Sequence, residues 1–206
     1  MNAMKPMAEF QMDVLREVGN IGAGHAATAL SKLLGKQVDM KVPKVKLVPF
    51  EQISDSVGGS EQVIIAVFLR VEGDVPGNLF FIFTQSSAKL LLSSLVMNGG
   101  EGEGHYTEME LSALQEIGNI LAGSYLTSLA ELTRLELIPS VPLLAMDMAG
   151  AILSYGLLQY GQMGDQALFI DTNFFEGSEA IEGHFFFIPD PDSFDNLFSA
   201  LGVPAS

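Results

Sequence analysis

Two stretches decide the fold: DVLREVGNIGAGHAATALS at residues 13–31 and SALQEIGNILAGSYLTSLA at residues 112–130. They lie 99 residues apart, and nine of their 19 positions are identical. The identical pairs are Leu15/Leu114, Glu17/Glu116, Gly19/Gly118, Asn20/Asn119, Ile21/Ile120, Ala23/Ala122, Gly24/Gly123, Thr28/Thr127 and Leu30/Leu129. An internal repeat is considered before any other feature of a sequence, because it limits which architectures are possible. The pattern therefore indicates two copies of one unit.

The repeat continues beyond these helical stretches. Pro43 and Pro142 keep the same spacing, and GNLFFIF at 77–83 matches GHFFFIP at 183–189 with a spacing of 106, so the second copy holds seven extra residues. Units of about 100 residues are marginally stable alone. We expect one domain in which two copies, about 10–97 and 107–201, share one core around a pseudo-two-fold axis. A glycine-rich linker at 98–106 joins them.

Hydrophobic periodicity and turn residues predict the elements of each copy. The first copy is expected to form a helix over 10–35, a hairpin with strands at 63–71 and 78–84, and a helix over 86–97. The second is expected to form a helix over 107–133, strands at 167–174 and 184–188, and a helix over 191–201. A short helix is expected within each of 45–54 and 145–160. Hairpins without crossovers indicate an α+β fold with a mainly antiparallel central sheet.

Composition excludes several classes of protein. The 206 residues carry a net charge of −15, which argues against nucleic acid or an anionic membrane surface as a partner. The chain has no cysteine, so disulfides, thiolate nucleophiles and cysteine-ligated zinc are excluded. The first residues lack the apolar core of a secretory signal, and no apolar run reaches the roughly 20 residues of a membrane span. We expect a soluble, cytoplasmic protein.

The repeated helix preserves its polar residues as well as its apolar ones. At about 100° per residue, one arc of roughly 60° collects Asp13, Glu17, Asn20 and Gly24 in the first copy and Ser112, Glu116, Asn119 and Gly123 in the second. The opposite side is expected to face the core through Leu15, Val18, Gly22, Ala26, Ala29 and Leu33, and through Leu114, Ile117, Leu121 and Leu132.

An amphipathic helix needs a polar outer face, and that need alone explains why these positions are polar. It does not explain why both copies have Glu and Asn three residues apart, since Lys, Gln or Arg would be solvated as well. Asn is also a mediocre residue for the middle of a helix. From the repeat alone, a functional site and inherited but idle similarity both remain open.

The motif resembles that of the CheC, CheX and FliY family of chemotaxis phosphatases. That family is marked by Asp or Ser, Glu four residues on, Asn three further, and Pro 23 residues after the Asn. Both copies match without a gap: Asp13, Glu17, Asn20 and Pro43, then Ser112, Glu116, Asn119 and Pro142. The duplication, and a length that leaves no room for an added switch domain, resemble the CheC type within this family.

The resemblance implies that the substrate is the phosphorylated response regulator CheY-P, whose phosphoryl group sits on an aspartate. The regulator would supply its own Mg²⁺ and catalytic Lys, so no intrinsic metal or cofactor is expected. Asn20 and Asn119 would position a water for in-line attack, and Glu17 and Glu116 would pair with the regulator's Lys.

The resemblance also implies a second partner, the receptor deamidase CheD. Related proteins bind CheD through the segment after Pro142, where a helix is expected to place Met146, Ala149, Ile152 and Leu153 on one apolar side. Asp147 is the only charge of this segment and is the expected CheD contact, although a plain core helix explains the pattern too. The alternative function is a non-catalytic adaptor that binds CheD or the flagellar switch in response to CheY-P.

Other groups of residues give weaker indications of a functional site. The order G-x-x-G-x-G at Gly19, Gly22 and Gly24 lies inside a helix, so close packing or docking explains it better than a nucleotide. His25, His105 and His184 lack metal-ligand spacing. The acidic residues near 171–182 lack calcium-loop spacing. Ser112 at the place of Asp13 argues against a pair of catalytic carboxylates.

Overall fold

The computed structural model describes residues 4–95, 106–160, 166–176, 179–191 and 193–202. The first copy forms α1 (Met4–Leu34), β1 (Asp39–Pro49), a short 3₁₀ turn η1 (Phe50–Gln52), α2 (Ile53–Ser56), β2 (Val63–Gly73), β3 (Gly77–Thr84) and α3 (Gln85–Ser94). The second forms α4 (Glu108–Thr133), β4 (Leu137–Pro139), β5 (Leu143–Met148), α5 (Ala149–Tyr160), β6 (Gln166–Glu176), β7 (Glu179–Pro189) and α6 (Ser193–Ala200). The linker expected at 98–106 lies almost entirely outside the described residues.

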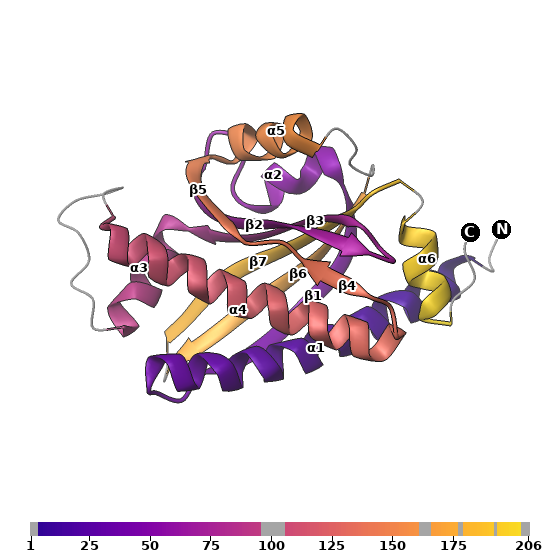
Figure 1. Cartoon of the computed structure of the whole chain (residues 1–206), viewed down its shortest axis with the longest axis horizontal. Coiled ribbons are helices and arrows are strands. Elements are labelled where there is room, and N and C mark those ends of the chain that lie inside the picture. The colour runs from indigo at the N-terminus through magenta and orange to yellow at the C-terminus, as the bar shows by residue number, and fades with distance from the viewer. Residues whose placement is uncertain (1–3, 96–105, 161–165, 177–178, 192, 203–206) are drawn as a thin grey trace.

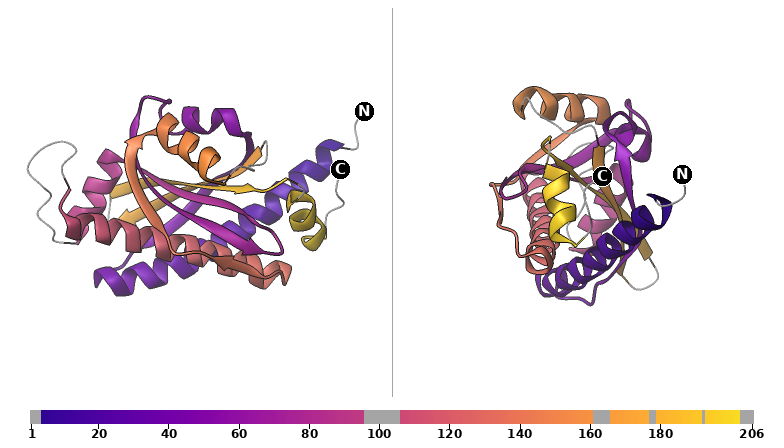
Figure 2. Two further views of the ribbon diagram at one scale, coloured as in Figure 1. Left: turned by 45° about the horizontal axis from the view of Figure 1, so that its top comes forward. Right: turned by 90° about the vertical axis from the view of Figure 1, so that its right-hand side faces the viewer.

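The elements form three layers. Helices α1 and α4 lie along one face of the sheet, and α2 and α5 cover the other (Figure 1). Alternate residues of the strands therefore enter two separate cores. On β3, Leu79, Phe81 and Phe83 face α1 and α4, whereas Phe80 and Ile82 face α2 and α5. The turned views in Figure 2 show the same layering from two further directions. The expected α+β class with a mainly antiparallel sheet is confirmed.

A pseudo-two-fold axis passes through the middle of the sheet. The strand order is β1-β6-β7-β3-β2-β4, with β5 also paired to β2, and β7 lies beside β3 at the centre. In that central pair Phe80 lies opposite Phe186, and these two residues are equivalent in the repeat. Lys46 of the first copy pairs with Phe169 of the second, and Ala145, the sequence equivalent of Lys46, pairs with Ala66 of the first. The duplication read from the sequence is thus also a symmetry of the structure.

The two copies exchange their first strands. Strand β1 of the first copy pairs with β6 of the second, and β4 and β5 of the second copy pair with β2 of the first. Neither copy therefore holds a complete half of the sheet.

Each of the stretches 45–54 and 145–160 contains helical structure, as expected, but its first residues belong to a strand. Residues 45–49 continue β1 and residues 145–148 belong to β5, so helical structure starts at Phe50 and at Ala149. Each of these strands pairs with a partner from the other copy, and such long-range pairing overrides local propensity. The seven extra residues of the second copy lengthen α5 relative to its counterpart α2.

The long helices match their predicted inner faces except at Ala29, which is half-buried, and in the last turn. Leu15, Val18 and Ala26 are buried, as are the inward residues of the second helix up to Leu121. Leu33 and Leu132, expected to face inward, are 46% and 49% exposed. Each lies next to the last residue of its helix, where few neighbours remain to cover it. The core contact comes one turn earlier, from Leu30 and Leu129.

The shared glycines separate into two groups. A Cβ on Gly118 would lie 2.6 Å from Val67 of the sheet, and one on Gly19 would lie 3.3 Å from Val42. Gly22 is equally confined, because its Cβ would meet the ring of Tyr125 at 2.7 Å. Gly24 and Gly123 face open space. Close packing therefore accounts for the glycines at 19, 22 and 118. Gly24 and Gly123 instead leave the helix surface beside each motif without a side chain.

We expect Gly118→Ala and Gly123→Ala to change stability in opposite directions. The first forces a methyl group into Val67, and such overpacking costs roughly 1–3 kcal/mol. The second removes a glycine from a helix without a new contact, which stabilises by roughly 0.5–1 kcal/mol. Urea unfolding of both variants and the wild type measures the difference. Equal stability of the two variants would contradict the packing described at Gly118.

Candidate functional site

The first motif lies on the outer surface of α1. Asp13, Glu17 and Asn20 are exposed, and the turns between them place their side chains along one side of the helix. Asp13 accepts a hydrogen bond from the Arg16 guanidinium at 2.6 Å. Within the described residues, the Asn20 carboxamide and the Glu17 carboxylate make no hydrogen bond or ion pair. Both groups are therefore open to an incoming molecule.

The second motif has the same layout on α4 with different neighbours. Ser112 and Glu116 are exposed, but Asn119 is half-buried. Gln115 occupies the position of Arg16, and its Nε2 donates to the Pro142 carbonyl at 2.9 Å. This contact joins the motif helix to the motif proline. Gln115 was not singled out from the sequence, although the difference between Arg16 and Gln115 was visible in the repeat.

The strands that carry the motif prolines also differ. In the first copy Val42, just before Pro43, is 5% exposed and lies against Gly19 and hence next to Asn20. In the second copy Val141, just before Pro142, is 80% exposed, because the strand is interrupted between β4 and β5. The first motif is therefore bordered by a packed strand and the second by an exposed loop.

Contacts between α1 and α4 hold the two motifs in fixed relation. The Tyr125 ring packs on Gly22, and its hydroxyl lies 2.9 Å from that of Thr172. Burial raises the pKa of Tyr125 to about 12, and the hydrogen bond to Thr172 offsets part of that rise. On the same side of α1, His25 Nδ1 lies 3.3 Å from the Ser128 hydroxyl.

The two motifs face away from each other. Gly22 and His25 mark the side of α1 that touches α4, and at about 100° per residue Asn20 falls on roughly the opposite side. The pseudo-two-fold axis gives Asn119 the same relation to α1. Two molecules could therefore approach the two motifs from different directions.

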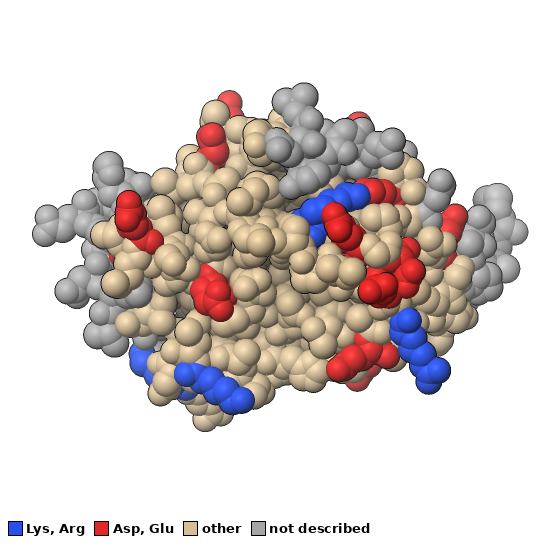
Figure 3. Space-filling view, in the orientation of Figure 1, with Lys and Arg blue, Asp and Glu red and all other residues tan. Residues whose placement is uncertain are grey.

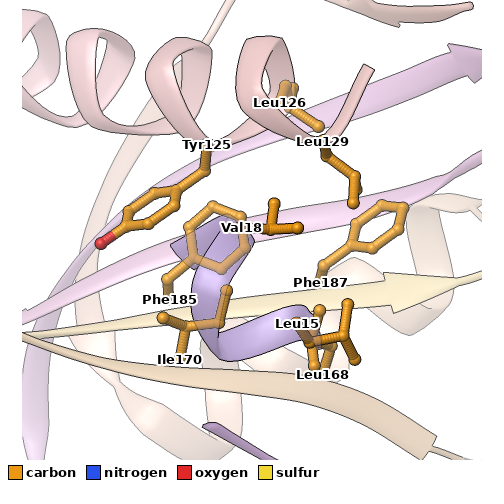
Figure 4. Close-up of a pocket in the computed structure, with 9 residues that line it drawn as sticks. All are labelled: Leu15, Val18, Tyr125, Leu126, Leu129, Leu168, Ile170, Phe185 and Phe187. Carbon is orange, nitrogen blue, oxygen red and sulfur yellow. The ribbon is translucent and has the colours of Figure 1, made fainter. Parts of the chain in front are cut away.

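Neither motif contributes to the apolar void under the long helices or to the hollow beside Asp147. An apolar void of about 20 Å³ lies between the α1–α4 pair and the sheet, walled by residues such as Leu15, Val18 and Tyr125 (Figure 4). Its walls offer too few polar atoms to hold even one water well. No cluster of three metal-ligating side chains occurs among the described residues. The motifs thus lie on open helix surfaces, where a reaction needs groups from a partner.

The segment around Asp147 forms a strand, whereas the sequence predicts a helix there. Met146 and Asp147 belong to β5, with Asp147 opposite Ile64 of β2. Asp147 is exposed, and its Oδ1 accepts from the Met148 backbone N–H at 2.7 Å. Of the residues expected on one apolar side, Ala149, Ile152 and Leu153 are buried in α5, whereas Met146 is 39% exposed.

A second hollow, of about 510 Å³, opens beside Asp147. Its floor is formed by Phe68 and Phe80 and its sides by β5 and α5; the lining residues are Phe68, Phe80, Ala145, Met146, Asp147, Ala151, Ile152, Ser154 and Tyr155. Asp147 is the one charged residue among them.

The fold is shared with solved structures of FliY and FliM. The chain superposes on Thermotoga maritima FliY with a TM-score of 0.69 and 23% identity, covering 94% of this chain and 96% of that one. It also superposes on the FliM middle domain of H. pylori with a TM-score of 0.68 and 12% identity, covering 93% and 98%. At these identities the likeness concerns the fold. It defines a pseudo-symmetric α+β protein of the type shared by FliY and FliM.

Sequence comparison assigns the chain within that class. The model of the CheC-like family matches residues 10–47 and 109–144, which include both copies of the motif. The CheY-P phosphatase CheC of Bacillus subtilis is 46% identical over 210 residues, covering 98% of this chain and 99% of that protein. The flagellar motor switch phosphatase FliY of the same organism is 33% identical over 127 residues, covering 60% of this chain and 32% of that protein. The chain belongs to the CheC-like family.

Proposed function

We propose that this chain is a phosphatase that removes the phosphoryl group from the aspartyl-phosphate of the response regulator CheY-P. The observation that carries the proposal is the Glu/Asn motif that occurs twice, each time on an outer helix surface. The name of the Bacillus subtilis relative, a CheY-P phosphatase, supports it. No described helix is both long and apolar enough to cross a membrane. We place the reaction in the cytoplasm with its regulator.

Asn20 and Asn119 are the groups that position the attacking water. A carboxamide can accept a hydrogen bond from a water and donate one to it without adding charge beside the phosphoryl group. An aspartyl-phosphate is already activated, so an in-line water is the main requirement. A hundredfold acceleration corresponds to about 2.7 kcal/mol, which one well-placed amide can supply.

Glu17 and Glu116 serve to dock the regulator. Their charge would repel a phosphoryl group, so they are unsuited to attack it. A carboxylate one helical turn from the Asn suits a charge-assisted hydrogen bond to the active-site Lys of the regulator. The regulator would bring its own Mg²⁺, and the chain needs no metal of its own for this reaction.

The direct test measures phosphate release. A regulator phosphorylated with acetyl phosphate is freed of excess donor and followed with and without this protein. Faster loss of phosphate supports the phosphatase. Tight binding of the phosphorylated regulator without faster loss would support the adaptor instead.

We expect Asn20→Ala and Asn119→Ala each to lower turnover while binding of the phosphorylated regulator stays nearly unchanged. Each change removes the water-positioning group of one motif, and the two motifs face away from each other. The double variant should lose turnover by about a hundredfold or more. Phosphate release and fluorescence anisotropy measure the two quantities. Complete loss in Asn20→Ala alone would contradict two independent sites.

We expect Glu17→Lys combined with Glu116→Lys to weaken binding of the regulator. A cation at these positions would face the regulator's Lys, and like charges in contact cost up to several kcal/mol. Glu131→Lys on α4 combined with Asp195→Lys on α6, two exposed changes outside the motifs, is the charge-matched control. Unchanged affinity of the double variant relative to that control would remove the proposed pairing.

We also propose that the chain binds the receptor deamidase CheD through the surface around Asp147. That surface combines an exposed strand end, the hollow on Phe68 and Phe80, and one carboxylate. Its exposed apolar residues include Met146, Met148 and Tyr155. Apolar surface with flexible Met side chains suits protein docking.

We expect Asp147→Lys to weaken binding of CheD and to leave phosphatase activity in place. The residue is exposed, and its side chain contacts the next backbone N–H, so charge reversal should leave the fold intact. Asp195→Lys, an exposed change on α6, is the control. Calorimetric titration with CheD measures the effect after circular dichroism has shown a wild-type melting curve. Wild-type affinity in the folded variant would exclude Asp147 from the interface.

A further inference from the structure

The identical positions of the two long helices separate into an inner and an outer group. Four of the nine identical pairs are buried in both copies, and core packing explains them: Leu15/Leu114, Gly19/Gly118, Ala23/Ala122 and Leu30/Leu129. The other five pairs are exposed or half-buried: Glu17/Glu116, Asn20/Asn119, Ile21/Ile120, Gly24/Gly123 and Thr28/Thr127. Two of these outer pairs are the Glu and Asn of the motifs. The other three need a separate explanation.

The five outer positions of each helix form one continuous band, which we call the outer stripe. At about 100° per residue they fall within an arc of roughly 100°, and at about 1.5 Å per residue they span about 16 Å of helix. Ile21 follows Glu17 by four residues, and Gly24 follows Asn20 by four, so these pairs are neighbours on the helix surface. The outer stripe therefore extends each Glu/Asn motif toward the C-terminal end of its helix.

Helix stability does not explain the three additional pairs. Gly is the poorest helix former after Pro, and the β-branched Ile and Thr are poorer than Ala, Leu, Glu or Lys. A Cβ at Gly24 or Gly123 would meet no atom within 4 Å, so packing within the described structure does not require these glycines. Ile21 is 40% exposed, and both threonines of the outer stripe are exposed. Each copy thus keeps poor helix formers where the fold would accept better ones.

The outer stripe carries no charge beyond its glutamate. Residues 18–31 and 117–130 contain no Lys, Arg, Asp or Glu, although the chain has 10 basic and 25 acidic residues. The surface over the middle of α4 is correspondingly mostly uncharged (Figure 3). The outer face of a surface helix ordinarily carries charged side chains, whereas charged residues are depleted at the centre of protein interfaces. The lack of charge on both helices therefore indicates a docking face.

Inherited similarity without a function is the competing explanation. It provides no reason why exposed positions outside the outer stripe should diverge while those within it stay identical. Within 13–31, the exposed residues outside the stripe all differ from their counterparts: Asp13/Ser112, Arg16/Gln115 and His25/Ser124. The identity on the outer surface is thus confined to the stripe.

We propose that the outer stripe is the surface on which each copy binds the phosphorylated regulator, and that its Ile, Gly and Thr residues select the regulator by apolar contact. The inference rests on the proposed phosphatase function. Because the stripe is continuous with Asn20 and Asn119, it is assigned to this regulator. The surface proposed for CheD lies elsewhere, around Asp147.

Gly24 lies at the centre of this surface in the first copy. Its missing side chain leaves a gap bordered by Asn20, Ile21 and Thr28, its neighbours on the helix surface. The Thr28 hydroxyl donates to the Gly24 carbonyl at 3.0 Å, so the hydroxyl is already engaged within the helix. An apolar side chain of the regulator enters the gap and contacts Ile21, and the glycine allows the two backbones to approach closely. That approach holds the aspartyl-phosphate against Asn20, one turn earlier.

The test uses a protein in which only the first motif works. Asn119→Ala provides this background, and phosphate release gives the KM for the phosphorylated regulator and kcat. We expect Ile21→Ala and Gly24→Ala each to raise the KM about fivefold or more, because a contact at the centre of an interface is lost or obstructed. For Ile21→Ala, kcat should stay nearly unchanged, since the residue contributes binding alone. The melting temperature of Gly24→Ala should rise, because Ala is the better helix former.

A matched control lies on the same helix. Leu33 is an apolar residue of α1 outside the outer stripe and is 46% exposed, so Leu33→Ala removes a comparable side chain and should not raise the KM. In the Asn20→Ala background, which works through the second motif, Gly123→Ala should raise the KM and Leu132→Ala should not.

Two failures are distinguishable. If Ile21→Ala and Gly24→Ala have the same KM as Leu33→Ala, with turnover intact, the inference is overturned and the phosphatase stands. Lack of turnover by the unmodified chain would overturn both. A lower melting temperature of Gly24→Ala would assign that glycine a structural role, against the inference.

Discussion

The antiparallel pairing of β3 with β7, centred on Phe80 opposite Phe186, is the contact on which the rest of the molecule depends. Equivalent residues can meet each other in this way only on the pseudo-two-fold axis. Once this register is set, the hairpins β2–β3 and β6–β7 form one surface, and α1 and α4 pack across it as an equivalent pair. The positions of both motifs follow from that packing, because glycines at 19 and 118 bring each helix close to the strands beneath it.

The placement of the motifs explains how so few groups could form a site. Each Glu and Asn lies on a convex helix surface and not in a cleft, so the fold supplies a rigid support and a partner must supply the remaining walls. The fixed contact of Tyr125 with Gly22 keeps the helices from rotating against each other. Preorganisation of this kind suits a reaction in which positioning of a water is the main demand.

The sequence predicted those features that depend on neighbouring residues or on the repeat. The long helices, the two hairpins, the α+β class and the outward direction of Glu17, Asn20 and Glu116 follow from periodicity. The strands β1 and β5 could not be predicted from periodicity, because each acquires its conformation from a partner in the other copy. The half-burial of Asn119 and the hydrogen bond from Gln115 to Pro142 were not predicted either, because both depend on the surroundings of α4 in the folded chain, which no local pattern signals.

The burial of side chains at the helix ends could not be predicted from the sequence either. Leu33 and Leu132 have the right angular position for the core, but a helical wheel has no information about where the supporting strands stop. Asp147 illustrates the same point, since a run that suits a helix was divided between a strand and a helix by its pairing with Ile64.

The exchange of first strands has a consequence for synthesis of the chain on the ribosome. Strand β1 leaves the ribosome early, but Lys46 must wait for Phe169, 123 residues later, before it gains its neighbour. At about 5–20 residues per second, that delay amounts to roughly 6–25 s. During this time β1 is an unpaired strand next to other nascent chains. Its lysines, the register shift between Lys41 and Lys44, and Pro43 would then protect it from pairing with the wrong chain and so limit aggregation of the nascent protein.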